Sequence, residues 1–233
     1  MEILERPSPN HDARPPGTSV DILLLHYTGM ESAEAALARM CDPAAKVSAH
    51  YCIEEDGRIA RLVPEDRRAW HAGASCWAGA EDINARSIGI ELVNPGHEFG
   101  YRAFPEAQMT ALIALARDIL ARYPIPPRRV LGHSDVAPLR KEDPGELFDW
   151  ARLAGAGIGL WPQELASPAG VKAEAAAERE VRTGLARFGY GYLEDDFAAV
   201  VTAFQRHFRP GAVTGEADGE TAVVLRALLN LVD

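Results

Sequence analysis

Cysteine and positive charge are both scarce in this chain of 233 residues. Its three cysteines, Cys41, Cys52 and Cys76, leave at least one thiol unpaired, which favours a reducing compartment over a disulfide framework. None of them has the spacing of a zinc-binding cysteine pair. The 24 Lys and Arg residues are outnumbered by 34 Asp and Glu, giving a net charge of −10 at pH 7. The chain therefore lacks the basic footprint that nucleic-acid binding requires.

Long apolar runs and targeting signals are missing as well. No stretch approaches the roughly 20 apolar residues that a membrane-spanning helix needs. Residues 1–7 show no basic start, no apolar core and no lipidation cysteine. These absences predict a cytoplasmic protein without a membrane span, with a periplasmic location as the alternative if a leader has been removed. We expect a monomer.

The hydrophobic pattern predicts an α/β domain followed by a helical one. Strand-like runs at 22–26, 48–53, 59–63, 88–93 and 130–131 are interleaved with helical patterns at 32–40, 105–123 and from Pro144 onward. This order predicts a mixed β-sheet covered by helices. Further helices at 173–188, 194–208 and 218–232 predict a small all-α three-helix domain, in which His207 is expected to be an exposed polar residue.

Composition sets the expected domain boundaries. Residues 1–20 contain four prolines and predict an extended N-terminal arm. The α/β domain follows at 21–162. Residues 163–172 include a Ser-Pro-Ala-Gly run, which is typical of a linker, and the helical domain occupies 173–233.

Three residues have the chemistry of a catalytic metal site. His26 ends the first apolar strand, His133 follows another strand, and Asp143 lies in a loop bounded by prolines. Two imidazoles and a carboxylate suit Zn²⁺, and three protein ligands leave a fourth position open for water. Lys141 in the same loop is free to point at the same cavity. The His-Glu-x-x-His motif of many zinc peptidases is absent.

Glu91 is a candidate general base. It lies in the strand 88–93, on the face opposite Ile88, Ile90 and Leu92. A carboxylate in so apolar a strand is costly unless it is paired or used, and it could take a proton from metal-bound water. A structural alternative is an ion pair with Arg86.

The other candidates have structural alternatives too. His26 could be an ordinary polar strand end, and Asp143 could be the N-cap of a helix that Pro144 opens. Lys141 could be a solvated surface charge. These readings stay open on the residues alone.

Six motifs in order over residues 20–162 resemble the zinc-dependent N-acetylmuramoyl-L-alanine amidases of the AmpD/AmiD family, whose fold is that of the peptidoglycan-recognition proteins. They are His26-Tyr27-Thr28, Val47-Ser48-Ala49-His50-Tyr51, Ala69-Trp70-His71-Ala72-Gly73, Ser87-Ile88-Gly89-Ile90-Glu91, Gly132-His133-Ser134-Asp135-Val136-Ala137-Pro138 and Lys141-Glu142-Asp143-Pro144-Gly145. The run Ala203 to Pro210 is similar to the C-terminal module of the AmiD enzymes, which implies a peptidoglycan-binding-like helical domain.

The resemblance implies a role for each candidate residue. His26, His133 and Asp143 are the expected zinc ligands. Glu91 is the expected acid/base, and Lys141 is expected to stabilise the oxyanion of the tetrahedral intermediate.

Substrate contacts are expected from Trp70, His71 and the backbone of Ala137. Some relatives place an arginine nine residues before the catalytic glutamate, where this chain has Asp82, so the preference between anhydro and reducing muramyl groups stays open.

The implied reaction is hydrolysis of the amide that joins N-acetylmuramic acid to the L-alanine of the stem peptide. The expected partners are peptidoglycan fragments, in particular anhydro-muropeptides, in cell wall turnover and recycling. The alternative is a non-catalytic muropeptide-recognition protein of the same fold. Loss of a metal ligand typically marks such a protein, and all three ligands are present here.

Overall fold

The computed structural model describes residues 2–162 and 174–232. The predicted linker at 163–172 and the first residue of the predicted helical domain lie outside the described residues. The strands are β1 (Ile3–Glu5), β2 (His11–Ala13), β3 (Ile22–Tyr27), β4 (Tyr51–Ile53), β5 (Ile59–Arg61), β6 (Arg67–Ala69), β7 (Ser87–Leu92) and β8 (Val130–Gly132).

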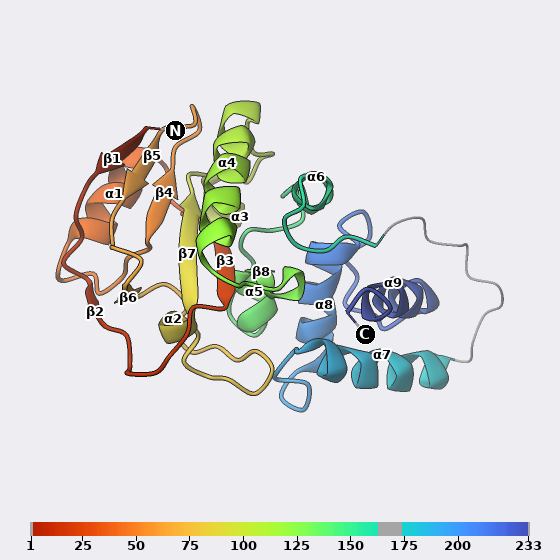
Figure 1. The fold of residues 1–233 in the computed structure, drawn as a ribbon. Coiled ribbons are helices and arrows are strands. Elements are labelled where there is room, and N and C mark those ends of the chain that lie inside the picture. The colour runs from red at the N-terminus through yellow and green to blue at the C-terminus, as the bar shows by residue number, and fades with distance from the viewer. Residues whose placement is uncertain (1, 163–173, 233) are drawn as a thin grey trace.

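Some helices cover the two faces of the main sheet, and α7, α8 and α9 form a group of their own towards the C-terminus (Figure 1). They are α1 (Ala33–Cys41), α2 (Ile83–Arg86), α3 (Gly96–Phe99), α4 (Glu106–Arg122), the 3-10 helix η1 (Pro127–Arg129), α5 (His133–Val136), α6 (Trp150–Gly155), α7 (Glu174–Phe188), α8 (Phe197–Phe208) and α9 (Gly219–Leu229). None of the helices in the described ranges is long and apolar enough to cross a membrane.

The main sheet has six strands in the order β1-β5-β4-β7-β3-β8. Strands β4, β7, β3 and β8 are parallel, whereas β5 runs antiparallel to β4. The mixed sheet with covering helices confirms the predicted fold class. In this register His26 of β3 lies beside Glu91 of β7.

The two faces of β3 bury different layers. Leu23 and Leu25 pack in a cluster with residues of α4, whereas Ile22 and Leu24 pack in a cluster with residues of α7, α8 and α9. Because side chains alternate along a strand, His26 lies on the same face as Ile22 and Leu24. The metal-site candidate His26 therefore lies on the face of the sheet that does not carry α4.

The first 20 residues, for which an extended arm was expected, are built into the fold. Strand β1 pairs in parallel with β5 at the edge of the main sheet, and β2 pairs with β6 in a second, two-stranded sheet. In the same segment, just after β2, Arg14 donates hydrogen bonds to the carbonyl oxygens of Glu65, Ala85 and Ser87 at 3.0, 2.7 and 2.9 Å. The segment is therefore anchored, not a free arm.

The helix predicted to begin at Pro144 begins at Trp150 instead. Asp149 is its N-cap and accepts from the backbone N–H of Arg152 at 2.9 Å. The preceding residues form a loop held by Tyr101, whose hydroxyl donates to the Pro144 carbonyl at 2.7 Å. Asp143 is therefore not the N-cap of a helix. A long-range tyrosine contact has overridden the local helix signal of Pro144.

The prediction that His207 is exposed is wrong. Its side chain is 3% exposed, and its ring stacks on Trp150 and Phe208 with centroid distances of 3.6 and 3.7 Å. The reason is that α8 docks against the α/β layers. Figure 1 shows α8 beside α5 and β8, and the two parts share one buried apolar cluster.

Candidate metal centre

Three ligand atoms converge at the carboxyl end of β3. His26 Nδ1 lies 3.0 Å from His133 Nδ1, and Asp143 Oδ2 lies 3.0 and 3.1 Å from these two nitrogens. All three residues are buried. A tetrahedral ion with bonds of about 2.0 Å places its ligand atoms about 3.3 Å apart. The observed triangle is slightly smaller than one face of such a site, and a small outward movement of the three side chains would admit the ion. The donor set and its spacing fit a divalent metal with one open position.

The ring nitrogens of both histidines that face away from the triangle have polar partners, which orient the rings. His133 Nε2 lies 3.0 Å from the carbonyl oxygen of Ala72 and 3.3 Å from the Arg140 guanidinium. The carbonyl favours the tautomer with the proton on Nε2, which leaves Nδ1 free for a metal. Burial, followed by the nearby His133, lowers the pKa of His26 to about 4. His26 is therefore neutral at neutral pH, which is the form that binds a metal.

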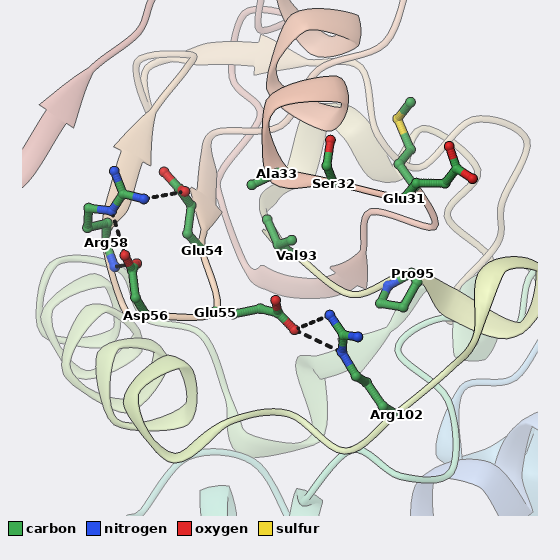
Figure 2. Close-up of a pocket in the computed structure, with 11 residues that line it drawn as sticks. Glu31, Ser32, Ala33, Glu54, Glu55, Asp56, Arg58, Val93, Pro95 and Arg102 are labelled. Carbon is green, nitrogen blue, oxygen red and sulfur yellow. Dashed lines mark hydrogen bonds and ion pairs between the residues drawn. The ribbon is translucent and has the colours of Figure 1, made fainter.

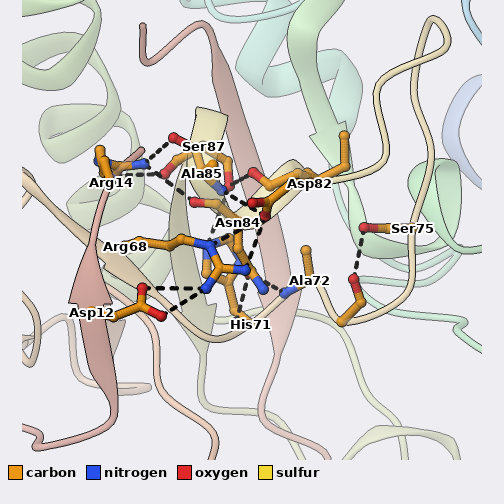
Figure 3. A network of polar contacts seen from close by, with 12 residues as sticks. Asp12, Arg14, Arg68, His71, Ala72, Ser75, Asp82, Asn84, Ala85 and Ser87 are labelled. Atoms are coloured by element: carbon orange, nitrogen blue, oxygen red, sulfur yellow. Dashed lines mark hydrogen bonds and ion pairs between the residues drawn. The ribbon is translucent and has the colours of Figure 1, made fainter. Parts of the chain in front are cut away.

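His71 orients His26 from behind. Its Nδ1 lies 3.0 Å from His26 Nε2, and its Nε2 lies 3.3 Å from Ser87 Oγ, which itself donates to the Ile83 carbonyl at 2.7 Å. Figure 3 shows His71 near Ser87 and Asn84, and Asn84 Oδ1 accepts from the backbone N–H groups of His71 and Ala72. The predicted contact between His71 and a stem peptide therefore has no free ring nitrogen to make it.

Gly89 is a residue of this centre that the sequence analysis missed. It lies in the middle of β7, and a Cβ atom built on it would lie 2.6 Å from the His71 ring. A glycine inside an apolar strand is typical of a close approach by another group, and this was the available signal. Only glycine at this position leaves room for the imidazole that supports His26.

Gly89→Ala is expected to weaken metal binding by about tenfold, because the added methyl group displaces His71 from His26. Overpacking should also lower the free energy of unfolding by about 1–3 kcal/mol. Zinc competition with a chromophoric chelator and chemical denaturation measure the two effects. The same substitution at exposed Gly211, where a Cβ meets nothing within 4 Å, is the control. Unchanged zinc affinity in Gly89→Ala contradicts the role given to His71.

Glu91 is held as an unpaired carboxyl group next to the ligand triangle. Its Oε2 is buried and has no hydrogen-bond partner among the residues that the structure describes. Burial raises the pKa of Glu91 well above its usual value, the negative charge of Asp143 adds to this, and the positive charge of Lys141 opposes it. The alternative ion pair is wrong, because Arg86 Nε donates to Asp21 at 3.0 Å instead. A carboxyl oxygen that is buried without a partner, in a side chain that is otherwise partly exposed, is poised to exchange a proton.

Lys141 is partly buried in the loop that carries Asp143. Its positive charge contributes to the lowered pKa of His26 and opposes the raised pKa of Glu91, so Lys141 is close enough to influence both residues. This is a suitable place for a cation that meets a developing negative charge.

The remaining predicted contacts lie around the centre. Trp70 is partly exposed and its backbone N–H donates to Ser48 Oγ at 2.9 Å. Both backbone groups of Ala137 already have partners, since its N–H donates to the His133 carbonyl at 2.9 Å and its carbonyl accepts from the Lys141 N–H at 3.1 Å. Asp82 pairs with Arg68 at 3.1 Å (Figure 3). Substrate roles for Trp70 and Ala137 stay predictions.

A pocket of about 370 Å³ opens at the same edge of the sheet (Figure 2). Its walls include Glu54 and Val93, which directly follow β4 and β7, and Met30, which lies three residues beyond the end of β3. Its charged groups are largely paired, for example Glu55 with Arg102 at 2.8 Å and Asp56 with Arg58 at 2.7 Å. Open α/β sheets bind ligands at the carboxyl ends of their strands, where both this pocket and the metal centre lie.

Comparison of sequences identifies related proteins. A family model described as N-acetylmuramoyl-L-alanine amidase matches residues 16–146. N-acetylmuramoyl-L-alanine amidase AmiD of Escherichia coli K12 is 42% identical, and the match covers 90% of this chain and 82% of that protein. 1,6-anhydro-N-acetylmuramyl-L-alanine amidase AmpD of Citrobacter freundii is 38% identical over 63% of this chain and 86% of its own length.

Solved structures give the same result. AmiD from E. coli in complex with anhydro-N-acetylmuramic acid-L-Ala-D-gamma-Glu-L-Lys has a TM-score of 0.80 and 38% identity, covering 93% of this chain and 92% of its own. AmpDh3 from Pseudomonas aeruginosa in complex with anhydromuramic pentapeptide has a TM-score of 0.76 and 35% identity, covering 91% of this chain and 92% of its own. The chain therefore belongs to the N-acetylmuramoyl-L-alanine amidase family.

Proposed function

We propose that this amidase is zinc-dependent and cleaves the bond between the lactyl group of N-acetylmuramic acid and L-alanine in soluble 1,6-anhydro-muropeptides, in cell wall recycling. The observation that carries the zinc assignment is the ligand triangle of His26, His133 and Asp143, with sides of 3.0 to 3.1 Å. Zinc is redox-inert and prefers tetrahedral nitrogen and oxygen donors, which this triangle supplies.

The side chains divide the chemistry. Zinc bound there supplies Lewis-acid chemistry, polarising the scissile carbonyl and activating water. Glu91 accepts a proton at its carboxylate and returns it to the departing amine of L-alanine. Lys141 stabilises the negative charge that develops on the carbonyl oxygen.

The anhydro-sugar preference rests on the relatives. Both solved complexes described above hold anhydromuramyl peptides, and the AmpD relative is named for a 1,6-anhydro substrate. A cytoplasmic setting, where such soluble fragments would be met, is part of this proposal. The proposal also includes a peptidoglycan-binding role for the helical C-terminal part, predicted at 173–233.

Offered side by side, anhydromuramyl-tripeptide is expected to be cleaved at least about tenfold faster than intact sacculi, because the proposed substrate is a soluble fragment. Mass spectrometry of the released peptide identifies the bond that is cut, and a chelator followed by zinc readdition tests the metal. Faster release from sacculi contradicts the recycling role. Binding of muropeptide without any cleavage favours the non-catalytic recognition protein.

A further inference from the structure

Helix α8 contacts both segments that carry the metal ligands. Two consecutive residues, Arg206 and His207, point from α8 into the α/β part (the helix lies beside α5 in Figure 1). His207 reaches α5, whose first residue is His133. Arg206 reaches the loop that contains Lys141 and Asp143. The helical part of the chain thus contacts the segments that carry His133 and Asp143 without contributing a metal ligand itself.

The contact to α5 is made through the carboxylate of Asp135, which is completely buried. Its Oδ2 lies 2.7 Å from His207 Nδ1 and accepts from the Gly132 N–H at 2.7 Å, and its Oδ1 accepts from the Tyr190 hydroxyl at 2.6 Å. A buried carboxylate is costly unless donors surround it. Two of these three partners, His207 and Tyr190, come from the helical part of the chain.

The geometry couples this carboxylate to the metal ligand. Gly132 immediately precedes His133, so the bond from Asp135 to the Gly132 N–H fixes the turn at which β8 becomes α5. The ring of His207 is itself held between Trp150 and Phe208. A displacement of Asp135 would therefore move the backbone that presents the His133 imidazole.

The contact to the second segment is an ion pair. Arg206 donates from a terminal nitrogen to Glu142 at 2.8 Å, and Glu142 lies between Lys141 and Asp143 in sequence. The Arg206 side chain is 16% exposed, whereas that of Glu142 is 48% exposed, so the pair is only partly shielded from water. Helix α8 therefore contacts both the segment that carries His133 and the loop that carries Asp143.

The two donors from the helical part lie outside the segment that the family model matches. The family model ends at residue 146, before α7, α8 and Tyr190. The matched segment therefore does not itself supply the two donors to Asp135.

We infer that His207 and Tyr190 are positioning residues, which set metal affinity by fixing Asp135 and through it His133. The inference rests on the proposed zinc site, and it gives the helical part a role in the reaction centre in addition to any binding of cell wall. Residues that support a metal ligand indirectly typically change metal affinity by about 10- to 100-fold.

Two variants of the full chain remove one donor each. Tyr190→Phe loses only the hydroxyl group, and His207→Leu replaces the imidazole by an apolar side chain. Each is expected to weaken zinc binding about tenfold in chelator competition. His207→Asn can keep a donor close to the position of Nδ1 and should restore most of the affinity. In the metal-free protein, amide hydrogen exchange at residues 132–136 should be faster in the first two variants.

Gln205→Ala is the matched control. Gln205 is also a buried polar residue of α8, but among the described residues its side chain bonds to Thr214, Gly215, Glu216 and Thr221, all within the helical part. It should lower stability without changing zinc affinity or exchange at 132–136.

Two results overturn the inference: unchanged zinc affinity and exchange in Tyr190→Phe and His207→Leu, or an equal loss in Gln205→Ala. If the wild-type protein binds no zinc, the proposed function fails. Hydrogen exchange in the metal-free variants still decides whether these residues fix α5.

Discussion

Asp143→Ala is expected to abolish both metal binding and turnover. The wild-type protein should carry about one zinc per chain, as three protein ligands and an open position imply. Asp143 supplies the only anionic ligand of the triangle. Without it, two neutral nitrogens remain to hold a divalent cation.

The loss should be large because the metal's Lewis acidity contributes several kcal/mol of transition-state stabilisation. A loss of about 4 kcal/mol corresponds to about 1,000-fold in kcat/KM. Elemental analysis after dialysis and turnover of anhydromuramyl-tripeptide measure the two effects. Asp66→Ala, which changes an exposed carboxylate in the same part of the chain, should keep both metal and activity. Wild-type activity in metal-free Asp143→Ala contradicts the proposed mechanism.

Local patterns were sufficient to predict the fold and the ligand candidates. Strand alternation placed Glu91 opposite Ile88 and Ile90, and the observed register puts it beside His26. The ends of parallel strands meet at one edge of a sheet, so polar residues at those ends converge. Asp143 comes from a loop, and its place in the triangle was expected from the family resemblance together with the residue types.

Contacts between distant parts of the chain could not be predicted in this way. His207 falls on a helix whose partner surface is formed by residues about 70 positions away, so its burial depends on docking that the local pattern does not encode. Pro144 carried a valid helix signal, but the hydroxyl of Tyr101 holds the following loop. Gly89 shows the intermediate case. Its position in a strand indicated a close approach, but not that a histidine makes it.

The unpaired state of Glu91 is costly to the fold and useful to the reaction. Its pKa is raised by burial, so its ionised form is disfavoured in the folded state relative to the unfolded state. Its contribution to stability is therefore favourable at low pH and is lost as pH rises through the raised pKa. A carboxyl group retained at such a position is typical of a functional site and not of a structural one.

Glu91→Gln is therefore expected to separate catalysis from binding and from stability. Glutamine keeps the shape of the side chain but cannot take up the proton, and loss of a general base typically lowers kcat by about 100-fold to 10,000-fold. Zinc content and muropeptide affinity, measured by elemental analysis and calorimetry, should stay close to wild type. At neutral pH the metal-free variant should unfold at the same or a higher temperature, because no buried charge remains at this position.

Glu34→Gln, on the exposed side of α1, is the control and should change none of these. Wild-type turnover in Glu91→Gln assigns the proton transfer to another group, and a lower melting temperature makes Glu91 a structural residue of β7.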